Sequence, residues 1–519
     1  MKATNKKGKV NPPTAGRVYL VGAGPGRIDL ITLRGLELLK RADCVIYDKL
    51  ANPALLRYTK SDAELIAAPK RIGGESFTQQ QINKLLVEKA GEHSEIVRLK
   101  GGDPYIFGRG TEEAKWLADN GIYFEVVPGV TAAIAASAYA GIALTDRDFS
   151  SQVAFITGHE AEGKQQSSID WENLAHFGGT LCFYMAMENF DFIVEQLTSK
   201  GISPDTPAAV ITDATQPTQK TVKATLATIA GECKKQKIGP PAIIVIGSTA
   251  KGDSRLEWLA KQPLFGKTLV ITRDAEGNAE LADKIAAKMG LVIELPVTKL
   301  KPLTDSTAFL KTLSEIKAYD WVIFTSATGV EQVFGFLIKL NKGARILGSA
   351  KIAAIGRGTA SQLAKFGIRA DFVPTTFTSR ILAKELIETA QLRGRKVLLL
   401  RSKLASDELP GMLSKAGAVV TNVPVYTQEK NLCDLGNLSE MLAEKRVDWI
   451  IFASPFSATC FYEQVPVEFV KSSNAKVASI GPVTTKRLTE LGVQVVLEPA
   501  EHTIDGLLSA IEQTEARKS

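Results

Sequence analysis

The stretch RLKGGDPYIFGRGTEEA at residues 98–114 decides which fold the first half of the chain adopts. Its apolar residues end at two glycines, an aspartate and a proline, and a further glycine-flanked turn leads into a helical pattern. A buried strand that enters a loop of this kind lets the backbone approach a ligand closely, because glycine lacks a Cβ. The segment VYLVGAGPG at residues 18–26 predicts a second strand and loop of the same type.

The spacing of glycines in VYLVGAGPG disfavours a dinucleotide-binding fold. The glycines lie at positions 22, 24 and 26, which gives G-x-G-x-G instead of the G-x-G-x-x-G fingerprint. Asp48 follows the strand-like CVIY, but it does not close that strand as a ribose-binding acid usually does. A nicotinamide oxidoreductase therefore stays only as a weak alternative.

Around these loops, short apolar segments alternate with longer helical patterns, which predicts an α/β fold. Strands are predicted at residues 18–22, 44–48, 95–102, 123–129, 152–159, 180–186, 207–213 and 242–247. Helices are predicted at residues 32–41, 78–90, 110–120, 131–141, 188–200 and 222–232.

The second half contains an internal repeat. DWVIFTSATGV (320–330) is similar to DWIIFASPFSA (448–458), and segment 351–374 is similar to segment 476–499. Two copies predict two similar α/β lobes with a cleft between them. Each copy carries two hydroxyl-rich turns before helices, and helix N-termini supply free N–H groups for an anion. Ordinary N-capping explains any single turn equally well.

Composition excludes several classes of function. The chain has 519 residues and a net charge of +7, but the only basic run is MKATNKKGK, so residues 1–16 are expected to form a disordered basic tail. The sequence shows no basic face with interleaved aromatic residues, so nucleic-acid binding is not indicated. Five scattered cysteines and four distant histidines predict neither disulfides nor a metal site. No leader or membrane span is visible, so a cytoplasmic location is expected.

The motifs together resemble two known families. VYLVGAGPG, CVIYDKL, GGDPYIF, VVPGVTAA and TLCFYMA, in this order, make residues 17–250 resemble uroporphyrinogen-III C-methyltransferase. VITR, DWVIFTSATGV, AIGRGTA, VLLLR, VPVY and IGPVTT make residues 267–515 resemble uroporphyrinogen-III synthase, with 251–266 as a linker. The resemblance implies a two-domain α/β unit of the tetrapyrrole-methylase type, followed by a two-lobed α/β unit with a two-strand hinge.

The resemblance also implies the reactions. The synthase half would cyclise hydroxymethylbilane to uroporphyrinogen III, with inversion of the last ring and loss of water. The methyltransferase half would then move two methyl groups from S-adenosyl-L-methionine to that product, giving precorrin-2 for sirohaem or cobalamin. No metal and no nicotinamide would be needed, and the chain would form a homodimer through its first half. A two-lobed solute-binding protein is the other alternative, but such proteins are normally exported.

For the methyltransferase half the resemblance implies an acid–base pair, Asp48 and Lys70. A solvated or substrate-binding role is the alternative for Asp48, and a turn residue at a strand end is the alternative for Asp103. Arginines that would pair with substrate carboxylates are Arg34, Arg71, Arg98, Arg109 and Arg147. The implied binding residues for S-adenosylmethionine are Pro25, Gly101, Gly102, Asp103, Ile106, Thr131, Ala132, Met185, Ala214 and Ala242. The chain departs from the family at Asp146, Ala186 and Ala214.

For the synthase half the resemblance places Tyr426 at the cleft, where its hydroxyl would assist the departure of water. A core tyrosine is the alternative. Carboxylates of the substrate would bind Ser326, Thr359, Ser454 and Thr484, with contributions from Arg273 and Arg401. Lobe one would comprise residues 267–298 and 426–512, lobe two residues 302–422, and the hinge residues 295–300 and 419–425.

Overall fold

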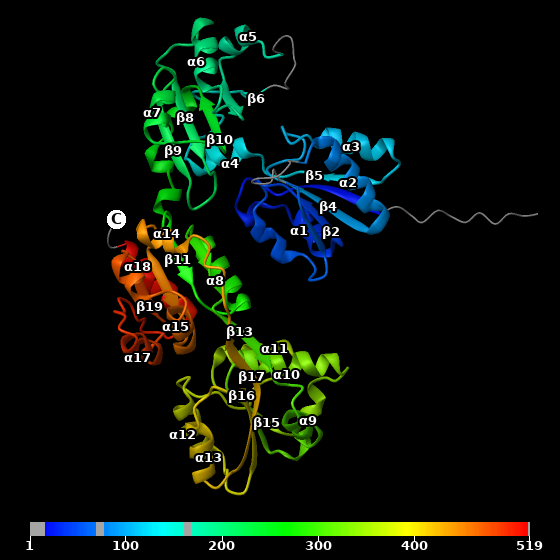
Figure 1. The fold of residues 1–519 in the computed structure, drawn as a ribbon, viewed down its shortest axis with the longest axis vertical. Coiled ribbons are helices and arrows are strands. Elements are labelled where there is room, and N and C mark those ends of the chain that lie inside the picture. The colour runs from blue at the N-terminus through cyan, green and yellow to red at the C-terminus, as the bar shows by residue number, and fades with distance from the viewer. Residues whose placement is uncertain (1–15, 69–76, 160–167, 517–519) are drawn as a thin grey trace, which may run out of the picture. The chain divides into compact units, whose positions relative to one another are not determined.

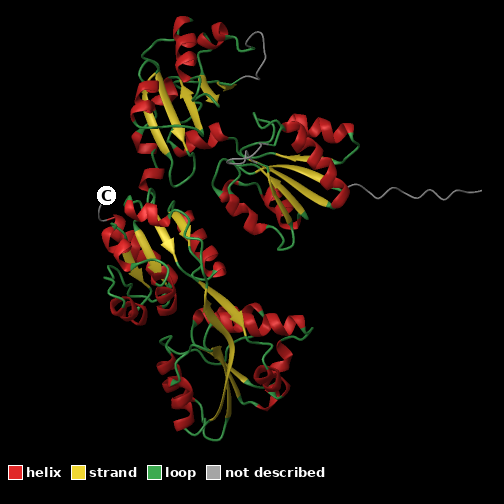
Figure 2. Ribbon diagram, in the orientation of Figure 1, coloured by secondary structure: helices red, strands yellow, loops and turns green. Residues whose placement is uncertain are grey.

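The structure is a computed structural model that describes residues 16–68, 77–159 and 168–516 (Figure 1). The backbone divides into two compact units. Unit one runs to Lys267 and includes Ile285–Leu291, and unit two comprises Thr268–Lys284 and the chain from Val292 onward. In each unit the strands form sheets and helices cover the faces of these sheets (Figure 2). The predicted α/β fold is therefore confirmed. In the part of the chain that is described, no helix is long and apolar enough to cross a membrane.

The first sheet of unit one is parallel throughout, in the order β3-β2-β4-β1-β5. Its core lies on both faces, because helices α2 and α3 pack against one and α1 against the other. Parallel strands bring their carboxyl ends to one edge of the sheet, which is where ligand-binding loops gather in such folds. The elements are β1 (Arg17–Gly22), α1 (Leu33–Arg41), β2 (Cys44–Tyr47), β3 (Glu64–Ala67), α2 (Gln79–Glu92), β4 (Glu95–Lys100), α3 (Gly110–Asp119) and β5 (Phe124–Val127).

The second sheet of unit one is mixed, in the order β6-β7-β10-β8-β9. Only β6 and β7 pair in parallel; the other three pairings are antiparallel. Helix α4 covers one face, and α6 and α7 cover the other. The elements are α4 (Ala132–Tyr139), β6 (Val153–Thr157), α5 (Trp171–Ala175), β7 (Thr180–Tyr184), α6 (Phe190–Ser199), β8 (Pro207–Thr212), β9 (Lys220–Thr225), α7 (Ile229–Lys235) and β10 (Ala242–Ile246).

The helix predicted at 222–232 is wrong over its first part. Residues 220–225 form the edge strand β9, whose threonines and valine suit a half-buried pleated surface. The helix α7 begins only at Ile229. The sequence pattern also predicts no strand at Glu64–Ala67, where the structure has the short strand β3. None of its four residues is fully buried.

Unit two holds two further sheets, in the orders β12-β11-β18-β19 and β13-β17-β16-β14-β15. The strands are β11 (Thr268–Ile271), β12 (Leu291–Glu294), β13 (Thr298–Pro302), β14 (Trp321–Phe324), β15 (Lys351–Ala354), β16 (Lys396–Ser402), β17 (Val419–Lys430), β18 (Trp449–Phe452) and β19 (Lys476–Ser479). The helices are α8 (Ala275–Ala287), α9 (Thr307–Ser314), α10 (Ala327–Lys339), α11 (Arg357–Lys365), α12 (Ser379–Thr389), α13 (Glu408–Lys415), α14 (Leu438–Ala443), α15 (Pro455–Tyr462), α16 (Val467–Ser472), α17 (Pro482–Glu490) and α18 (Ile504–Ala516).

The two-strand hinge is present, but both of its strands lie further along the chain than predicted, with β13 at Thr298–Pro302 and the crossing part of β17 at 426–430. The twelve-residue strand β17 pairs in parallel with β16 over its first part. It then pairs antiparallel with β13, from Tyr426 opposite Pro302 to Lys430 opposite Thr298. Residues 426–430 therefore form the crossing, while 419–425 belong to the sheet of β16.

Candidate active sites

Three glycine loops of unit one meet at the carboxyl ends of β1, β4 and β5. A Cβ on Gly22 would lie 2.6 Å from the Cα of Gly129, and a Cβ on Gly129 would lie 2.2 Å from the carbonyl oxygen of Gly102. Gly24 and Gly102 exchange backbone hydrogen bonds of 3.2 and 2.8 Å. The loops therefore need glycine in order to touch, and half-buried Pro25 sits in the first of them.

Asp103 joins two of these loops through its carboxylate. Its Oδ1 accepts from the backbone N–H groups of Tyr105 and Ile106 at 2.8 and 3.1 Å. Its Oδ2 accepts from the N–H of Gly129 at 3.0 Å. Both carboxylate oxygens thus accept hydrogen bonds from backbone N–H groups. The Asp103 side chain therefore shapes the loop in which Gly101, Gly102 and Ile106 lie.

The loops around this site carry unusual backbone conformations. Phe107, Arg109, Met185, Asp213 and Thr215 all have φ between 49° and 67°, a region that non-glycine residues seldom adopt. Such strain persists where the surrounding structure holds it, and it is concentrated at ligand sites. Met185 is 53% exposed, so it is available to a ligand.

The loops of the second sheet that hold Ala214 and Ala242 are tied together and reach the first glycine loop. The N–H of Asp213 donates to the carbonyl of Pro241 at 3.3 Å. Thr215 is fully buried and its hydroxyl accepts from the N–H of Arg27 at 3.1 Å. A Cβ on Gly26 would lie 2.3 Å from Nε2 of Gln216. The two domains of unit one therefore contact each other at this loop.

Tyr184 holds the start of helix α4, a role that sequence reasoning missed. Its hydroxyl lies 2.7 Å from that of Thr131 and accepts from the N–H of Ala133 at 3.0 Å. Burial raises the pKa of the Tyr184 phenol, so it stays neutral there. The phenol thus caps the helix in place of Thr131, next to half-buried Ala132. The signal in the sequence is the YM pair of TLCFYMA, in which Tyr184 directly precedes the predicted ligand residue Met185.

Asp48 stands at the mouth of a buried charged group that sequence reasoning did not anticipate. Arg98 donates to Oδ1 of Asp48 at 2.5 Å and to Oε1 of Glu113 at 3.1 Å. Lys100 also donates to Oε1 of Glu113, at 2.9 Å. The Asp48 side chain is 29% exposed, whereas those of the other three are at most 3% exposed. Burial, followed by the charge of Arg98, lowers the pKa of the Lys100 ammonium.

Several predicted side chains lie elsewhere. Arg98 points into this buried group, so its predicted role in pairing with a substrate carboxylate is wrong. Arg34 pairs with Glu125 at 2.9 Å, and Arg109 with Glu112 at 2.8 Å. Lys70 and Arg71 lie outside the described residues. The departures Asp146 and Ala214 are half-buried, and Ala186 is fully buried.

In unit two, Tyr426 meets the first of the four hydroxyl-rich turns. Its hydroxyl lies 3.0 Å from Oγ of Ser326, which itself caps α10 by accepting from the N–H of Gly329 at 3.0 Å. Tyr426 is 8% exposed. Burial is the main reason that the pKa of its phenol is raised, although hydrogen bonds to Ser326 and Ser402 oppose the shift. The hydroxyl is therefore neutral and hydrogen-bonded at the point where β17 enters the hinge.

The other three turn residues lie at the starts of their own helices, and Ser454 alone among them caps its helix. Ser454 caps α15 by accepting from the N–H of Ser457 at 3.0 Å. Thr359 and Thr484 are buried in the first turns of α11 and α17. The structure thus brings Ser326 together with Tyr426, while the four turns do not contact one another through any described hydrogen bond.

Arg401 does not face Tyr426. Alternation along β16 directs it, with Leu399, to the face that α12 and α13 cover, whereas Tyr426 packs in the core on the opposite face. Its side chain is almost wholly buried and donates to the carbonyl of Ser406 at 2.5 Å. Arg273 lies against Gly277 at the start of α8. A Cβ added to Gly277 would lie 2.5 Å from Nε of Arg273.

Comparison with known proteins identifies the family. The model "Tetrapyrrole (Corrin/Porphyrin) Methylases" matches residues 17–230, and "Uroporphyrinogen-III synthase HemD" matches residues 279–509. "Porphyrin biosynthesis protein HemD" of Ruminiclostridium josui is 33% identical over 499 residues, which cover 96% of this chain and 97% of that protein. The chain belongs to the family that fuses a uroporphyrinogen-III C-methyltransferase to a uroporphyrinogen-III synthase.

Two further relatives are more similar to this chain over a part of its length. "S-adenosyl-L-methionine-dependent uroporphyrinogen III methyltransferase" of Methanosarcina barkeri is 48% identical over 232 residues, 45% of this chain and 91% of its own length. "Uroporphyrinogen-III C-methyltransferase" of Bacillus subtilis is 40% identical over 352 residues, 68% of this chain and 72% of its own. The resemblance drawn from the motifs is confirmed for both halves of this fusion family.

Proposed function

We propose that the chain catalyses two consecutive steps of tetrapyrrole synthesis. It cyclises hydroxymethylbilane to uroporphyrinogen III, with inversion of the last ring and loss of water. It then transfers two methyl groups from S-adenosyl-L-methionine to this product, which gives precorrin-2. Membership of the fusion family carries the proposal, and the contact between the three glycine loops supports a ligand site in the methyltransferase half.

Methyl transfer forms a carbon–carbon bond to a pyrrole carbon while the bond from sulfur to the methyl group breaks. The electron-rich substrate is itself the nucleophile, so correct placement of the two reactants supplies much of the rate. We assign binding of the methyl donor to Pro25, Gly101, Gly102, Asp103, Ile106, Thr131, Ala132, Met185, Ala214 and Ala242. Among these, Asp103 acts by holding the loops through three backbone N–H groups.

The methylated ring must then lose a proton, and Asp48 is the assigned acceptor. Its carboxylate is partly exposed, while Arg98 behind it fixes one oxygen. Lys70 is assigned as the partner acid. General acid–base groups of this kind contribute about 10²–10⁴-fold to a rate when their geometry is correct.

Ring closure in the synthase half requires the hydroxyl of hydroxymethylbilane to leave as water. We assign Tyr426 as the proton donor for this step, because its phenol is neutral and hydrogen-bonded to Ser326. Substrate carboxylates are assigned to the helix starts at Ser326, Thr359, Ser454 and Thr484, where N–H groups and hydroxyls favour anions.

The proposal includes the domain limits given by the motifs, a homodimer and a cytoplasmic location.

An apolar groove of about 580 Å³ in unit one supports the homodimer. It is lined by Ile134, Ala138, Leu144, Leu256 and Trp258 among others. A second copy of the chain is the proposed occupant. Light scattering of the purified chain should give twice the mass of 55.9 kDa, and Ile134→Asp should halve it. A parent chain that scatters as a monomer would contradict this arrangement.

A coupled assay tests the two activities. The purified chain is incubated with hydroxymethylbilane and S-adenosylmethionine, and products are separated by mass spectrometry. A type III macrocycle that carries two added methyl groups is expected, while unchanged substrate would overturn the proposal.

Asp103→Ala tests the assignment of the glycine loops in the same assay. The variant should lower methyl transfer by about 100-fold or more, because loosened loops misplace the reactants. Uroporphyrinogen III should then accumulate at the parent rate. Asp170→Ala is the matched control, since Asp170 also accepts from a backbone N–H, at 3.0 Å, but at the start of α5. Equal methyl transfer in the two variants would refute the role of Asp103.

A further inference from the structure

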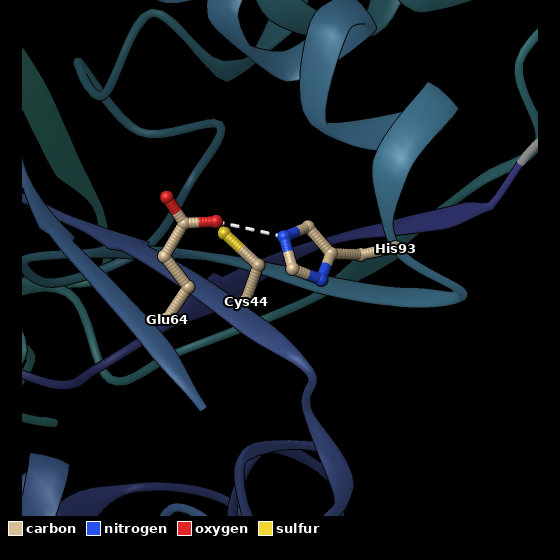
Figure 3. Close-up of side chains that lie close together, drawn as sticks. All are labelled: Cys44, Glu64 and His93. Carbon is tan, nitrogen blue, oxygen red and sulfur yellow. Dashed lines mark hydrogen bonds and ion pairs between the residues drawn. The ribbon is translucent and has the colours of Figure 1, made fainter. Parts of the chain in front are cut away.

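Three side chains of metal-binding type gather at the amino ends of β2 and β3, and we call them the Cys44 cluster: Cys44, Glu64 and His93 (Figure 3). One ligand atom from each lies within 4.8 Å of the other two. The glycine loops follow the carboxyl ends of the same sheet, so the Cys44 cluster lies at the opposite edge from the proposed methyl-transfer site.

The backbone around the Cys44 cluster fixes all three positions. Cys44 and Glu64 are the first residues of neighbouring parallel strands and are directly paired in register. His93 ends helix α2 and donates its N–H to the carbonyl of Lys89 at 2.9 Å. A Cβ on Gly16 would lie 1.9 Å from the carbonyl oxygen of His93. Residue 16 must therefore be glycine for the chain to pass this close to the histidine.

Lys89 orients the carboxylate toward the histidine. Its Nζ lies 2.9 Å from Oε1 of Glu64, which leaves Oε2 to meet Nε2 of His93 at 2.7 Å. An outer partner that holds one carboxylate oxygen and directs the other inward is a common support for a metal ligand. Figure 3 shows the Cys44 sulfur next to the Glu64 oxygen from which the dashed line runs to His93.

We propose that the Cys44 cluster binds one thiophilic divalent cation, with Zn²⁺ as the best fit. Zinc accepts thiolate sulfur, imidazole nitrogen and carboxylate oxygen at about 2.0–2.3 Å in a tetrahedron, and water completes the set when the protein offers three ligands. That geometry needs ligand atoms roughly 3.3–3.7 Å apart. Small side-chain rotations therefore suffice to close the cluster around an ion.

Binding changes protonation but not oxidation state. The Cys44 thiol gives its proton to solvent. The Nε2–H of His93, which donates to Glu64, also loses its proton to solvent, so the Nε2 lone pair binds the metal and the one proton of the neutral ring resides on Nδ1. The ion links the edge strand β3 to β2 and to the end of α2. Edge strands have unpaired backbone on one side, so a tie of this kind stabilises the part of the sheet that is least supported.

An ordinary ion-pair network is the competing interpretation. Glu64, His93 and Lys89 form such a network without sulfur, and only a metal site needs the Cys44 thiolate. Replacement of Cys44 therefore separates the two interpretations.

Metal titration of the chelator-treated full chain is the direct test. Equilibrium dialysis against Zn²⁺ should leave one ion per chain, and Co²⁺ should give a near-ultraviolet thiolate-to-cobalt band with the visible bands of a tetrahedral site. Cys44→Ser and His93→Gln should each weaken Zn²⁺ binding by at least about tenfold. The matched controls Cys233→Ala, which changes another buried cysteine, and His176→Gln should bind as the parent chain does.

Two outcomes would overturn the proposal. One is a parent chain that shows no cobalt–thiolate band, a result that needs no variant to fold. The other is equal Zn²⁺ binding by folded Cys44→Ser and Cys233→Ala chains, with folding checked by circular dichroism. Zn²⁺ should also raise the thermal midpoint of the parent chain but not that of Cys44→Ser. Because the proposal does not depend on either enzyme activity, its failure would leave the coupled assay unaffected.

Discussion

Two segments of unit two, residues 320–374 and 448–499, share one backbone plan but differ in what contacts it. Ser326 has φ −164° and ψ 152°, and Ser454 has φ −159° and ψ 154°. Each serine accepts from the N–H three residues later at 3.0 Å. Each segment also pairs its first strand in parallel with its second, from Trp321 opposite Lys351 and from Trp449 opposite Lys476.

The surroundings of the two segments differ at two points. In the first segment, Tyr426 from the hinge strand reaches the capping serine. In the second, Glu515 of helix α18 accepts from Nε1 of Trp449 at 3.1 Å and pairs with Lys476. Capping geometry is thus common to both segments, while the candidate chemistry lies in the first and a structural anchor in the second.

The largest expected effect is on the rate of ring closure. Tyr426→Phe should slow formation of uroporphyrinogen III by about 100-fold or more, because it removes the assigned proton donor and keeps the ring. Tyr462→Phe is the matched control, since this half-buried tyrosine lies in the second segment and its buried hydroxyl has no hydrogen-bond partner among the described residues. Initial rates from hydroxymethylbilane measure both variants. If the two variants react equally fast, the first segment has no special chemical role.

The next effect is on stability, and it belongs to the second segment. Glu515→Ala should lower the free energy of unfolding by about 2–3 kcal/mol, because Trp449 loses its buried acceptor and Lys476 its partner. Urea unfolding gives the value. Asp505→Ala, on the same helix, breaks an exposed pair with Lys284 and should cost less than about 0.5 kcal/mol. Equal losses would show that Glu515 is no anchor.

Smaller effects should distinguish the two capping serines. Ser326→Ala and Ser454→Ala should each cost about 1 kcal/mol, since each removes one N-cap. Of the two, only Ser326→Ala should also lower kcat of ring closure, because only Ser326 contacts the Tyr426 hydroxyl. Ser454, which is assigned to substrate binding, should affect KM instead. The informative measurement gives kcat and KM separately for both variants. A fall of kcat in Ser454→Ala as large as in Ser326→Ala would remove the distinction.

How much of this could be predicted from sequence depends on the range of the interaction. The glycine loops, the alternation of strands and helices within the repeat and the capping serines follow from local patterns. The contact of Tyr426 with Ser326 joins residues 100 positions apart, and nothing local marks it. The inward direction of Arg98 was missed for the same reason, because its partners Asp48 and Glu113 lie on other elements.

The Cys44 cluster shows the same limit. Sequence spacing predicts a metal site only when its ligands recur at short intervals. Here a strand start, its neighbour's start and a helix end supply one ligand each. Register and close packing at Gly16 bring them together, so the expectation of no metal site could not take account of them.

The smallest expected effect is on the pH dependence of stability. Burial raises the pKa of both the Tyr426 and the Tyr462 phenols, whereas in the unfolded chain tyrosine ionises near about pH 10. The unfolded state then binds fewer protons than the folded state above about pH 10, so stability is complete below that pH and falls as pH rises further. At pH 10.5 each tyrosine should account for less than about 1 kcal/mol of the loss.

Urea unfolding at pH 8.0 and pH 10.5 measures this loss. Tyr426→Phe and Tyr462→Phe should each reduce the difference between the two pH values by a similar amount, because burial acts on both rings. The two buried tyrosines would then agree in titration and differ only in catalysis. A pH difference that Tyr426→Phe leaves unaltered would instead mean that its phenol ionises as readily in the folded chain as in the unfolded one, and its assignment as a neutral donor would fail.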